Sequence, residues 1–244
     1  MAFPEERDAF APPPALVSRD DVPRYDAWDR AVHEALDAFH AGLMDKVVLA
    51  RRSRFQFAGA LDGLSLFMPL LERTPRAYHF CFQPRADHAF LGASPERLYR
   101  RQGRFIESEA VAGTRPRGAS AEEDDALARE LLADEKELRE HRYVVDGIRA
   151  ALERFCSAVH ADPAPSIMKQ PKVQHLHTRI EGILREESAH VDADLLRALH
   201  PTAAVGGTPR DRALAFIASR EGFDRGWYAG PVGWVGSDSA EFAV

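Results

Sequence analysis

The sequence predicts an α+β protein in which antiparallel strand pairs alternate with amphipathic helices. Two observations predict this class. Segments rich in β-branched and aromatic residues, such as 77–83 and 88–93, are joined by short polar turns, which is the pattern of a β-hairpin. Elsewhere, apolar residues recur at spacings of three and four, which is typical of helices that bury one face. With 244 residues, 45% of them hydrophobic, the chain has enough apolar material for one large domain.

The N-terminal part differs in composition from the rest. Residues 1–24 are expected to be an irregular linker, or the remnant of a preceding region, because their prolines remove amide donors. A single domain is expected over 25–244. Its first element is a helix over about 26–41, which Gly42 is well placed to end. The apolar face of this helix is formed by Trp28, Val32, Leu36 and Phe39.

The remaining elements are predicted from periodicity and capping signals. Ser120 and Glu123 have the spacing of a capping box, which opens a long helix over about 121–157. Residues 172–184 fit either a helix or a strand. The other predictions, in chain order, are a strand at 46–57, a helix at 64–72, the hairpin 77–83 with 88–93, a hairpin over 98–118, helices at 192–199 and 210–219, a glycine-rich strand at 227–235 and a return strand from 241.

Charge and cysteine content exclude several classes of protein. The net charge is −6, and no segment concentrates the basic residues, so nucleic acid is not an expected partner. Two cysteines argue against a disulfide framework and favour a reducing cytoplasm. No stretch approaches the roughly 18 apolar residues that a membrane span needs, and no secretion signal is recognisable.

Two titratable side chains are candidates for proton transfer. If 46–51 is a strand, Lys46 shares a face with apolar residues, and desolvation would lower its pKa and let it act as a base. The alternative is a solvated lysine at a strand end. Glu96 is either a residue near a helix start, capped by Ser94, or a carboxylic acid with a raised pKa in a pocket.

Two further carboxylates are candidates for a metal site. Glu137 and Glu140 lie three residues apart on one face of the predicted helix. Paired carboxylates attract Mg²⁺, which takes one or two of them together with substrate oxygens. The alternative is an ordinary solvated charged face.

Turns and a histidine pair offer binding groups. The loop 110–118 could hold a substrate carboxylate on backbone amides beside Thr114, or it is a tight turn with surface arginines. His175 and His177 would face the same way on a strand, but zinc needs more ligands, so a hydrogen-bonding histidine in a cleft is expected. The glycines in 200–210 could let the backbone approach a ligand closely.

These segments together resemble the chorismate-utilising enzymes, because seven of them occur in that family's order. They are KVVLAR, SPERL, AGTRPRG, DEKELREHRYVVD, VQHLHT, HPTAAVGGTPR and WYAGPVGW. The resemblance covers about residues 26–244. It implies an αβ sandwich of two large, mainly antiparallel sheets flanked by helices, with the active site in a deep cleft.

Within the family, the chain is most similar to the isochorismate synthases. Amine-transferring members usually carry glutamine where this chain has Lys46, and aminodeoxychorismate synthases tend to carry lysine where it has Ala112. The segment HPTAAVGG departs from the isochorismate synthase pattern HPTPAVGG only at Ala203. The resemblance therefore implies an isomerase that acts on chorismate with Mg²⁺ and without a glutaminase subunit.

The resemblance also implies roles for individual residues. Water would add at C2 of chorismate as the C4 hydroxyl leaves, with Lys46 as general base and Glu96 as general acid. Glu140, with Glu137 beside it, would hold Mg²⁺. The residues expected to bind the substrate are Gly113, Thr114, His175 and Tyr228.

Three alternatives remain open from the sequence. They are a salicylate synthase, an amine-transferring synthase with a glutaminase partner, and an inactive fragment that keeps the fold as a binding module. Menaquinone and siderophore biosynthesis are both compatible with the motifs. The family continues beyond the position of Val244 with an arginine-bearing strand and a helix that carries further metal-ligand glutamates. Residues 1–244 are therefore expected to be C-terminally incomplete, and inactive or weak on their own.

Overall fold

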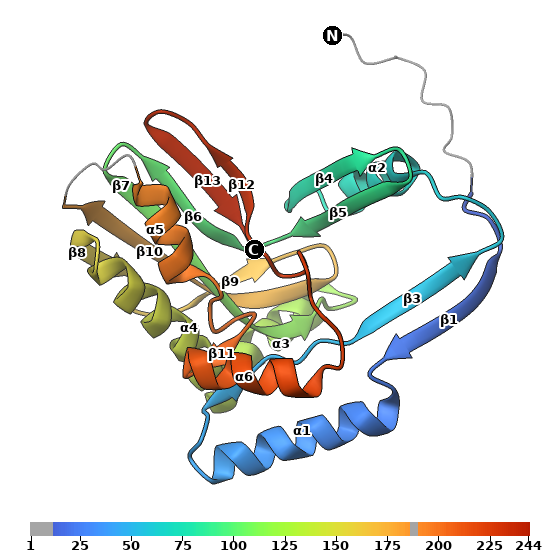
Figure 1. The fold of residues 1–244 in the computed structure, drawn as a ribbon. Helices are drawn as coiled ribbons and strands as arrows, with labels where there is room; N and C mark the ends of the chain where they lie inside the picture. The colour runs from blue at the N-terminus through green and yellow to red at the C-terminus, as the bar shows by residue number, and fades with distance from the viewer. Residues whose placement is uncertain (1–11, 186–189) are drawn as a thin grey trace.

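The structure, a computed structural model, describes residues 12–185 and 190–244. Its main body is a seven-stranded sheet with helices packed on one face, and a separate hairpin stands beside it (Figure 1). This arrangement confirms the α+β class. Of the two large sheets expected, the described residues form one, and the hairpin is a two-stranded sheet of its own.

The large sheet has the strand order β12–β13–β6–β7–β10–β8, and β9 also pairs with β10. All of these pairs are antiparallel. The ambiguous segment 172–184 is a strand, and β8 and β9 were not expected from the sequence. The strands are β6 (Arg97–Gln102), β7 (Phe105–Pro116), β8 (Cys156–Ala161), β9 (Ser166–Lys169), β10 (Val173–Leu184), β12 (Val232–Val235) and β13 (Ser239–Ala243).

Strands β7 and β10 form the backbone of this sheet. Each is twelve residues long, and they pair along almost their whole length. Before the bulge, even-numbered residues on β7 and β10, such as Ile106 and Ile180, are buried towards the helices. Glu109 and His177 are odd-numbered and lie on the opposite face. A bulge at Gly113, where φ is +77°, interrupts the register between these strands.

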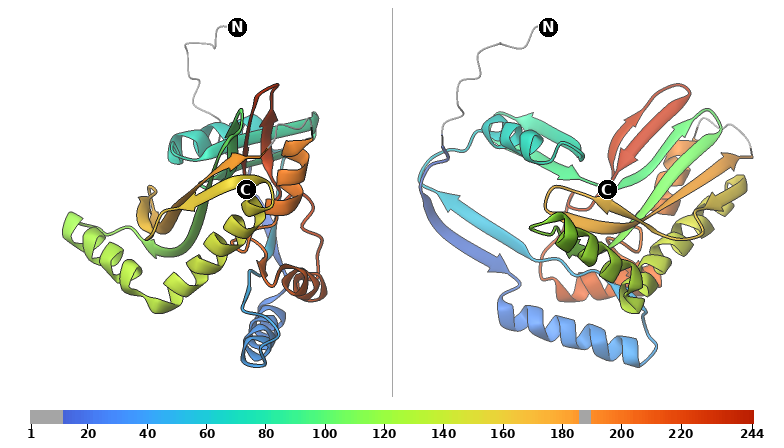
Figure 2. Two further views of the ribbon diagram at one scale, coloured as in Figure 1. Left: turned by 90° about the vertical axis from the view of Figure 1, so that its left-hand side faces the viewer. Right: turned by 180° about the vertical axis from the view of Figure 1, so that it is seen from behind.

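Helices α3 (Ala121–Ala133), α4 (Glu135–Glu153) and α5 (Val191–Leu199) lie against the sheet, and Figure 2 shows α4 running across its strands. The single helix expected over 121–157 is wrong. Asp134 breaks it, because its Oδ1 accepts from the amides of Lys136 and Glu137 at 3.0 and 3.1 Å and starts a new helix. The hydrophobic core between sheet and helices includes Leu98, Tyr99, Ile106, Val144, Ile148, Leu152, Ile180, Leu184, Leu195 and Leu199.

The predicted cap at Ser120 is confirmed, and Glu123 bonds to the amide one residue before the cap. The Ser120 hydroxyl accepts from the Glu123 amide at 3.2 Å, and the Glu123 carboxylate accepts in return from the Ala119 amide at 2.7 Å.

The separate hairpin consists of β4 (Tyr78–Arg85) and β5 (His88–Ser94), with α2 (Gly63–Arg73) packed on it. Both the hairpin and the helix are confirmed. Trp227 connects the hairpin to the C-terminal part of the chain, because its ring packs edge-on against Phe82 and Phe90, with centroid distances of 5.3 and 5.5 Å.

The N-terminal segment is more ordered than expected. Strand β1 (Leu16–Val22) pairs with β3 (Arg52–Phe57), so the expectation of an irregular region is wrong for residues 16–22, and residues 1–11 lie outside the described part. The prolines flank β1 rather than interrupt it, which leaves its amides free to pair. Helix α1 (Tyr25–His40) follows as predicted, and Gly42 ends it with a φ of +66°.

The strand expected at 46–57 is two strands. The first, β2 (Lys46–Val47), pairs with β11 (Gly207–Thr208), and the second is β3. Residues 48–51 leave the strand conformation because the Val48 carbonyl and the Ala50 amide bond to side chains from the 221–225 segment. Helix α6 (Arg210–Arg220) packs on β2 and β11.

The last expected strand is also shorter than predicted. Residues 226–229 form a turn, and β12 covers only the end of the predicted range 227–235. The return strand β13 pairs with both β12 and β6. No described helix is both long enough and apolar enough to pass through a lipid bilayer.

A buried ion pair secures α5 to the sheet. The Arg101 guanidinium on β6 donates to both carboxylate oxygens of Asp192, at 2.9 and 2.7 Å, and the Tyr99 hydroxyl donates to the same carboxylate at 3.1 Å. Arg101 and Asp192 are both buried. Removing one partner would leave the other charge buried without compensation.

The substitution Arg101→Met is therefore expected to lower the free energy of unfolding by about 3–5 kcal/mol, measured by urea denaturation. Arg197→Met is the matched control, because the Arg197–Asp194 pair on the same helix is exposed, and its loss should change stability by about 0.5 kcal/mol or less. Equal effects of the two substitutions would contradict the structural role of the buried pair.

Candidate active site

Lys46 lies where β2 meets β11, and its side chain is buried. The residue is 8% exposed, and its Nζ donates to the Ala203 carbonyl at 2.6 Å. Burial lowers the pKa of the ammonium, although the carboxylates of Glu140 and Glu96 oppose this effect. The alternative of a solvated lysine at a strand end is therefore wrong.

Gly207 makes this placement of Lys46 possible. A Cβ at position 207 would stand 2.2 Å from the Lys46 carbonyl oxygen and 2.7 Å from the Ala213 side chain. Only glycine allows the two backbones to approach so closely. At Gly207, the backbone of the lysine segment makes a close approach.

Glu96 lies in the connection between β5 and β6 and is also 8% exposed. The helix start considered for this segment is wrong. The Ser94 hydroxyl does accept from the Glu96 amide, at 3.2 Å, but it does so inside a strand-to-strand turn. Burial raises the pKa of Glu96 to about 8, the nearby Glu109 acts in the same direction, and Lys46 opposes both. Its Oε1 atom is buried without a hydrogen-bond partner among the described residues.

Sequence reasoning missed Glu109, which is the charged neighbour of Glu96. One oxygen of the Glu109 carboxylate accepts from the Arg97 amide at 2.7 Å, and the other lies 2.9 Å from Nε2 of His177. Its negative charge helps to keep Glu96 protonated. Alternation along β7 indicates which face Glu109 lies on, but its partners depend on the register with β10, which the sequence does not show.

Burial shifts the pKa values of Lys46 and Glu96 in the directions that acid–base chemistry needs. Burial works against the charged form of each group, so it favours a neutral amine and a neutral carboxylic acid. Each group also contributes to the pKa of the other. The structure therefore brings these two predicted residues into one electrostatic environment.

The bulge in β7 supports a second group of predicted residues. Thr114 Oγ1 lies 2.9 Å from Nδ1 of His175, on the neighbouring strand. Burial lowers the pKa of His175, which favours the neutral imidazole. A Cβ on Gly113 would lie 3.1 Å from a carboxylate oxygen of Glu137, so the bulge lies next to one of the two candidate metal ligands.

The two carboxylates predicted to bind metal lie on either side of an ammonium group. Lys136 Nζ is 3.2 Å from Glu137 and 2.9 Å from Glu140. Glu137 also lies 3.6 Å from the Arg115 guanidinium. Within residues 12–185 and 190–244, no group of three or more histidine, cysteine or acidic side chains has the arrangement of a metal site. Two carboxylates that share one cation do fit Mg²⁺, which needs only one or two protein carboxylates.

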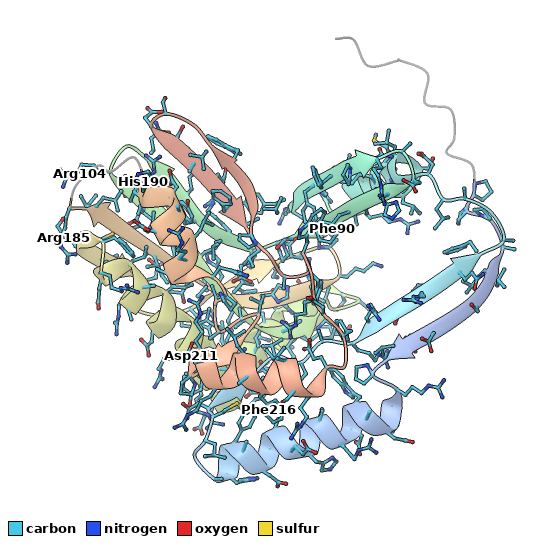
Figure 3. All side chains as sticks on the ribbon, viewed as in Figure 1. Phe90, Arg104, Arg185, His190, Asp211 and Phe216 are labelled. Carbon is cyan, nitrogen blue, oxygen red and sulfur yellow. The ribbon has the colours of Figure 1, made fainter. Side chains whose placement is uncertain are left out.

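Tyr228 is separate from these groups. It lies in the turn 226–229, not on the expected strand, and is 59% exposed. The neighbouring Trp227 packs on the hairpin that carries Phe90 (Figure 3). Among the described residues, no hydrogen bond or ring contact joins Tyr228 to Lys46, Glu96 or His175.

The raised pKa of Glu96 predicts a pH-dependent effect on stability. Its pKa rises from 4.5 to about 8 on folding, so the folded state retains a proton that the unfolded state loses, and stability falls as the pH rises through this window. Glu96→Gln removes the effect. The variant should be more stable than the wild type at pH 7, by up to about 3 kcal/mol, and the difference should vanish below about pH 4.

Urea denaturation of both proteins between pH 4 and pH 8 measures this difference. Glu153→Gln is the control, because Glu153 is an exposed carboxylate on α4. A Glu96→Gln variant that is no more stable than the wild type at pH 7 would contradict a protonated Glu96.

Comparisons with known proteins identify the family to which the chain is related. The family described as chorismate binding enzyme matches residues 2–244. The chain is 40% identical over 231 residues to isochorismate synthase MenF of Bacillus subtilis, covering 94% of this chain and 48% of that protein. It is 38% identical over 232 residues to the chloroplastic isochorismate synthase of Catharanthus roseus, covering 94% of this chain and 40% of that protein.

The solved structures show the same relationship. MenF, the menaquinone-specific isochorismate synthase from Escherichia coli, superposes with a TM-score of 0.87 at 34% identity, covering 96% of this chain and 54% of that one. The chain spans about half the length of the curated relatives it matches. By both sequence and fold, the chain belongs to the family of chorismate binding enzymes.

Proposed function

We propose that this protein catalyses the conversion of chorismate to isochorismate, with Lys46 as general base and Glu96 as general acid. The observation that carries the proposal is the burial of these two side chains, which shifts their pKa values in opposite directions. Relatives named as isochorismate synthases, at about 40% identity, support the same reaction.

The proposed reaction adds water at C2 of the ring and releases the C4 hydroxyl. The neutral amine of Lys46 takes a proton from the attacking water as the new C2–O bond forms. The protonated carboxyl of Glu96 gives its proton to the departing hydroxyl, which leaves as water. One proton enters Lys46 and one leaves Glu96, so a later transfer between these groups restores both.

The contact with Ala203 gives Lys46 its orientation. A neutral amine has two N–H donors and one lone pair, and one N–H bonds to the Ala203 carbonyl at 2.6 Å. That bond limits the directions in which the lone pair can point. An oriented base lowers the entropic cost of water activation.

We place substrate binding at the bulge in β7 and the adjacent histidine. Gly113 and Thr114 offer backbone and hydroxyl groups, and His175 is a neutral hydrogen-bonding side chain beside them. Tyr228 remains a candidate by family resemblance alone, because the described contacts link its turn to the β4–β5 hairpin.

Glu140 and Glu137 are the residues that would hold Mg²⁺. A bound Mg²⁺ would supply positive charge to neutralise a substrate carboxylate. The position of Glu137 beside the bulge at Gly113 supports this assignment, because it lies next to the residues proposed to bind the substrate.

The test is to incubate the purified product of the complete gene with chorismate and Mg²⁺ and to separate the products by chromatography. Isochorismate should form without a glutaminase partner and without ammonia. Fluorescent salicylate with release of pyruvate would favour the salicylate synthase alternative. Ammonia-dependent anthranilate or aminodeoxychorismate would overturn the assignment of Lys46 as a base for water.

Lys46→Gln is the decisive variant in this test. It should lower isochorismate formation at least about 100-fold, because general base catalysis contributes that much, while Mg²⁺-dependent chorismate binding persists. Lys172→Gln is the matched control, because it makes the same change at an exposed position. Retained turnover in Lys46→Gln would remove Lys46 from the mechanism.

Glu140→Gln is expected to weaken Mg²⁺ binding about tenfold or more, because it removes one of two anionic ligands. Titration calorimetry with Mg²⁺ measures the affinity directly, without catalysis. Glu135→Gln, in the first turn of the same helix, should leave the affinity unchanged. Equal affinities of the wild type and Glu140→Gln would place the metal elsewhere.

A further inference from the structure

The position of Lys46 depends on a very short piece of sheet. Strands β2 and β11 contribute two residues each. Their flanks add two backbone bonds, from the Asp45 amide to the Thr208 carbonyl and from the Val48 amide to the Gly206 carbonyl, both at 2.8 Å. So short a pairing is marginal by itself, and another group has to hold these segments together.

A buried carboxylate at the end of α6 provides the first contact. Glu221 follows the last residue of this helix and is 2% exposed. Its Oε1 accepts from the Ala50 amide at 2.7 Å, immediately after the segment that carries Lys46. Figure 3 marks α6 with Asp211 and Phe216, above α1.

The Arg225 guanidinium extends this contact to both segments. Its Nε donates to Glu221 at 2.8 Å. Its Nη2 donates to the Val48 carbonyl at 2.7 Å, and its Nη1 donates to the Val205 carbonyl at 2.9 Å. One planar group therefore joins the two backbones, and a planar fork of donors is specific to arginine.

The Val48 and Val205 carbonyls lie at the same sequence distance from the two residues of the Lys46–Ala203 contact. Val48 lies two residues after Lys46, and Val205 lies two residues after Ala203, the residue whose carbonyl accepts from the Lys46 side chain. By fixing these carbonyls relative to each other, Arg225 fixes the separation between the base and its acceptor.

We propose that Glu221 and Arg225 act as a positioning pair, which holds Lys46 against the Ala203 carbonyl. The inference rests on the proposed function, because it assigns the pair to the base of that reaction. Neither side chain is placed against the substrate, and both act through the backbone of 48–50 and 203–206.

The turn between the two residues supports this role. Gly222 and Gly226 have φ values of +70° and +56°, and the Asp224 carboxylate accepts from the Gly226 amide at 2.7 Å. This compact turn brings Arg225 back to Glu221, which lies four residues earlier at the end of the helix. Glu221 and Arg225 are thus close together in the chain, and they hydrogen-bond to backbone segments that are about 20 and 170 residues away.

Movement of Lys46 would change its electrostatic surroundings. The charged groups that act on it are Glu140, Glu96 and Glu137, which favour the ammonium, and Lys136, which disfavours it. Burial is the largest influence. Loosening the two segments admits water, so the amine becomes more like an ordinary lysine.

The test uses Arg225→Lys and Arg225→Met in the complete protein. Both variants should lower kcat by about 10- to 100-fold and leave KM within about threefold, because a misplaced base affects the chemical step more than binding. The rising limb of the pH–rate profile should shift to higher pH. Arg225→Lys should be the milder change, because its ammonium can still reach one carbonyl.

A second measurement does not depend on turnover. Acetylation of Lys46 by acetic anhydride, followed by mass spectrometry between pH 6 and pH 11, reports the midpoint of its deprotonation. The midpoint should rise in both Arg225 variants, and the limiting rate should increase as the site opens. Exposed Lys172 provides the internal reference in every sample.

Arg101→Met is the control that separates a displaced Lys46 from a general loss of stability. It breaks another buried arginine–carboxylate pair, so it should cost comparable stability. Its folded form should keep kcat within about twofold, and its Lys46 midpoint should match that of the wild type. If Arg225→Met does not fold, Glu221→Gln makes the same comparison, because it keeps an acceptor for the Ala50 amide and removes the charge.

The outcomes distinguish this inference from the proposed function. Wild-type isochorismate formation with unchanged kcat and an unchanged Lys46 midpoint in the Arg225 variants would overturn the positioning role alone. A wild type that makes no isochorismate would overturn the proposed function, and the acetylation midpoints would still decide whether the pair positions Lys46.

Discussion

The antiparallel pairing of β7 with β10 is the constraint on which the rest of the structure depends. It places the apolar residues of both strands against the helices. Glu109, His175 and His177 lie on the opposite face. A slip of one residue would exchange these two sets, because side chains alternate between faces. The bulge at Gly113 shifts the register once, at the end where Thr114 meets His175. The same backbone hydrogen bonds therefore align the core residues of these strands and the Glu109, Thr114 and His175 part of the candidate site.

The candidate site combines groups that burial makes unfavourable as ions. Lys46 and Glu96 come from segments 50 residues apart, and each is desolvated by the packing around it. Desolvation of this kind costs folding free energy, and the buried ion pairs elsewhere show how the fold limits that cost. Arg101 and Asp192 hydrogen-bond to each other through both carboxylate oxygens, whereas Oε1 of Glu96 has no hydrogen-bond partner among the described residues. The cost of burying Glu96 is instead limited by its raised pKa, which favours the neutral acid.

Local signals predicted much of the fold. The hairpins, the Ser120 cap and α1 follow from periodicity and capping, which act over a few residues. Local signals did not predict the breaks at Asp134 and at 48–51. At both places, side-chain hydrogen bonds end the element although its apolar pattern continues. Family resemblance supplied Lys46, Glu96, Gly113 and Thr114. It did not supply Glu109, Glu221 or Arg225, because their roles depend on contacts between distant segments that no motif spacing encodes.

The neighbourhood of Glu96 has a consequence for the return of the enzyme to its starting state. Once Glu96 has given up its proton in the proposed reaction, its carboxylate faces the negative charge of Glu109, and burial disfavours it further. The Lys46 ammonium formed in the same proposed step opposes both effects, because it stabilises the carboxylate. Burial and Glu109 therefore favour return of a proton to Glu96, and the protonated Lys46 is the group that can supply it.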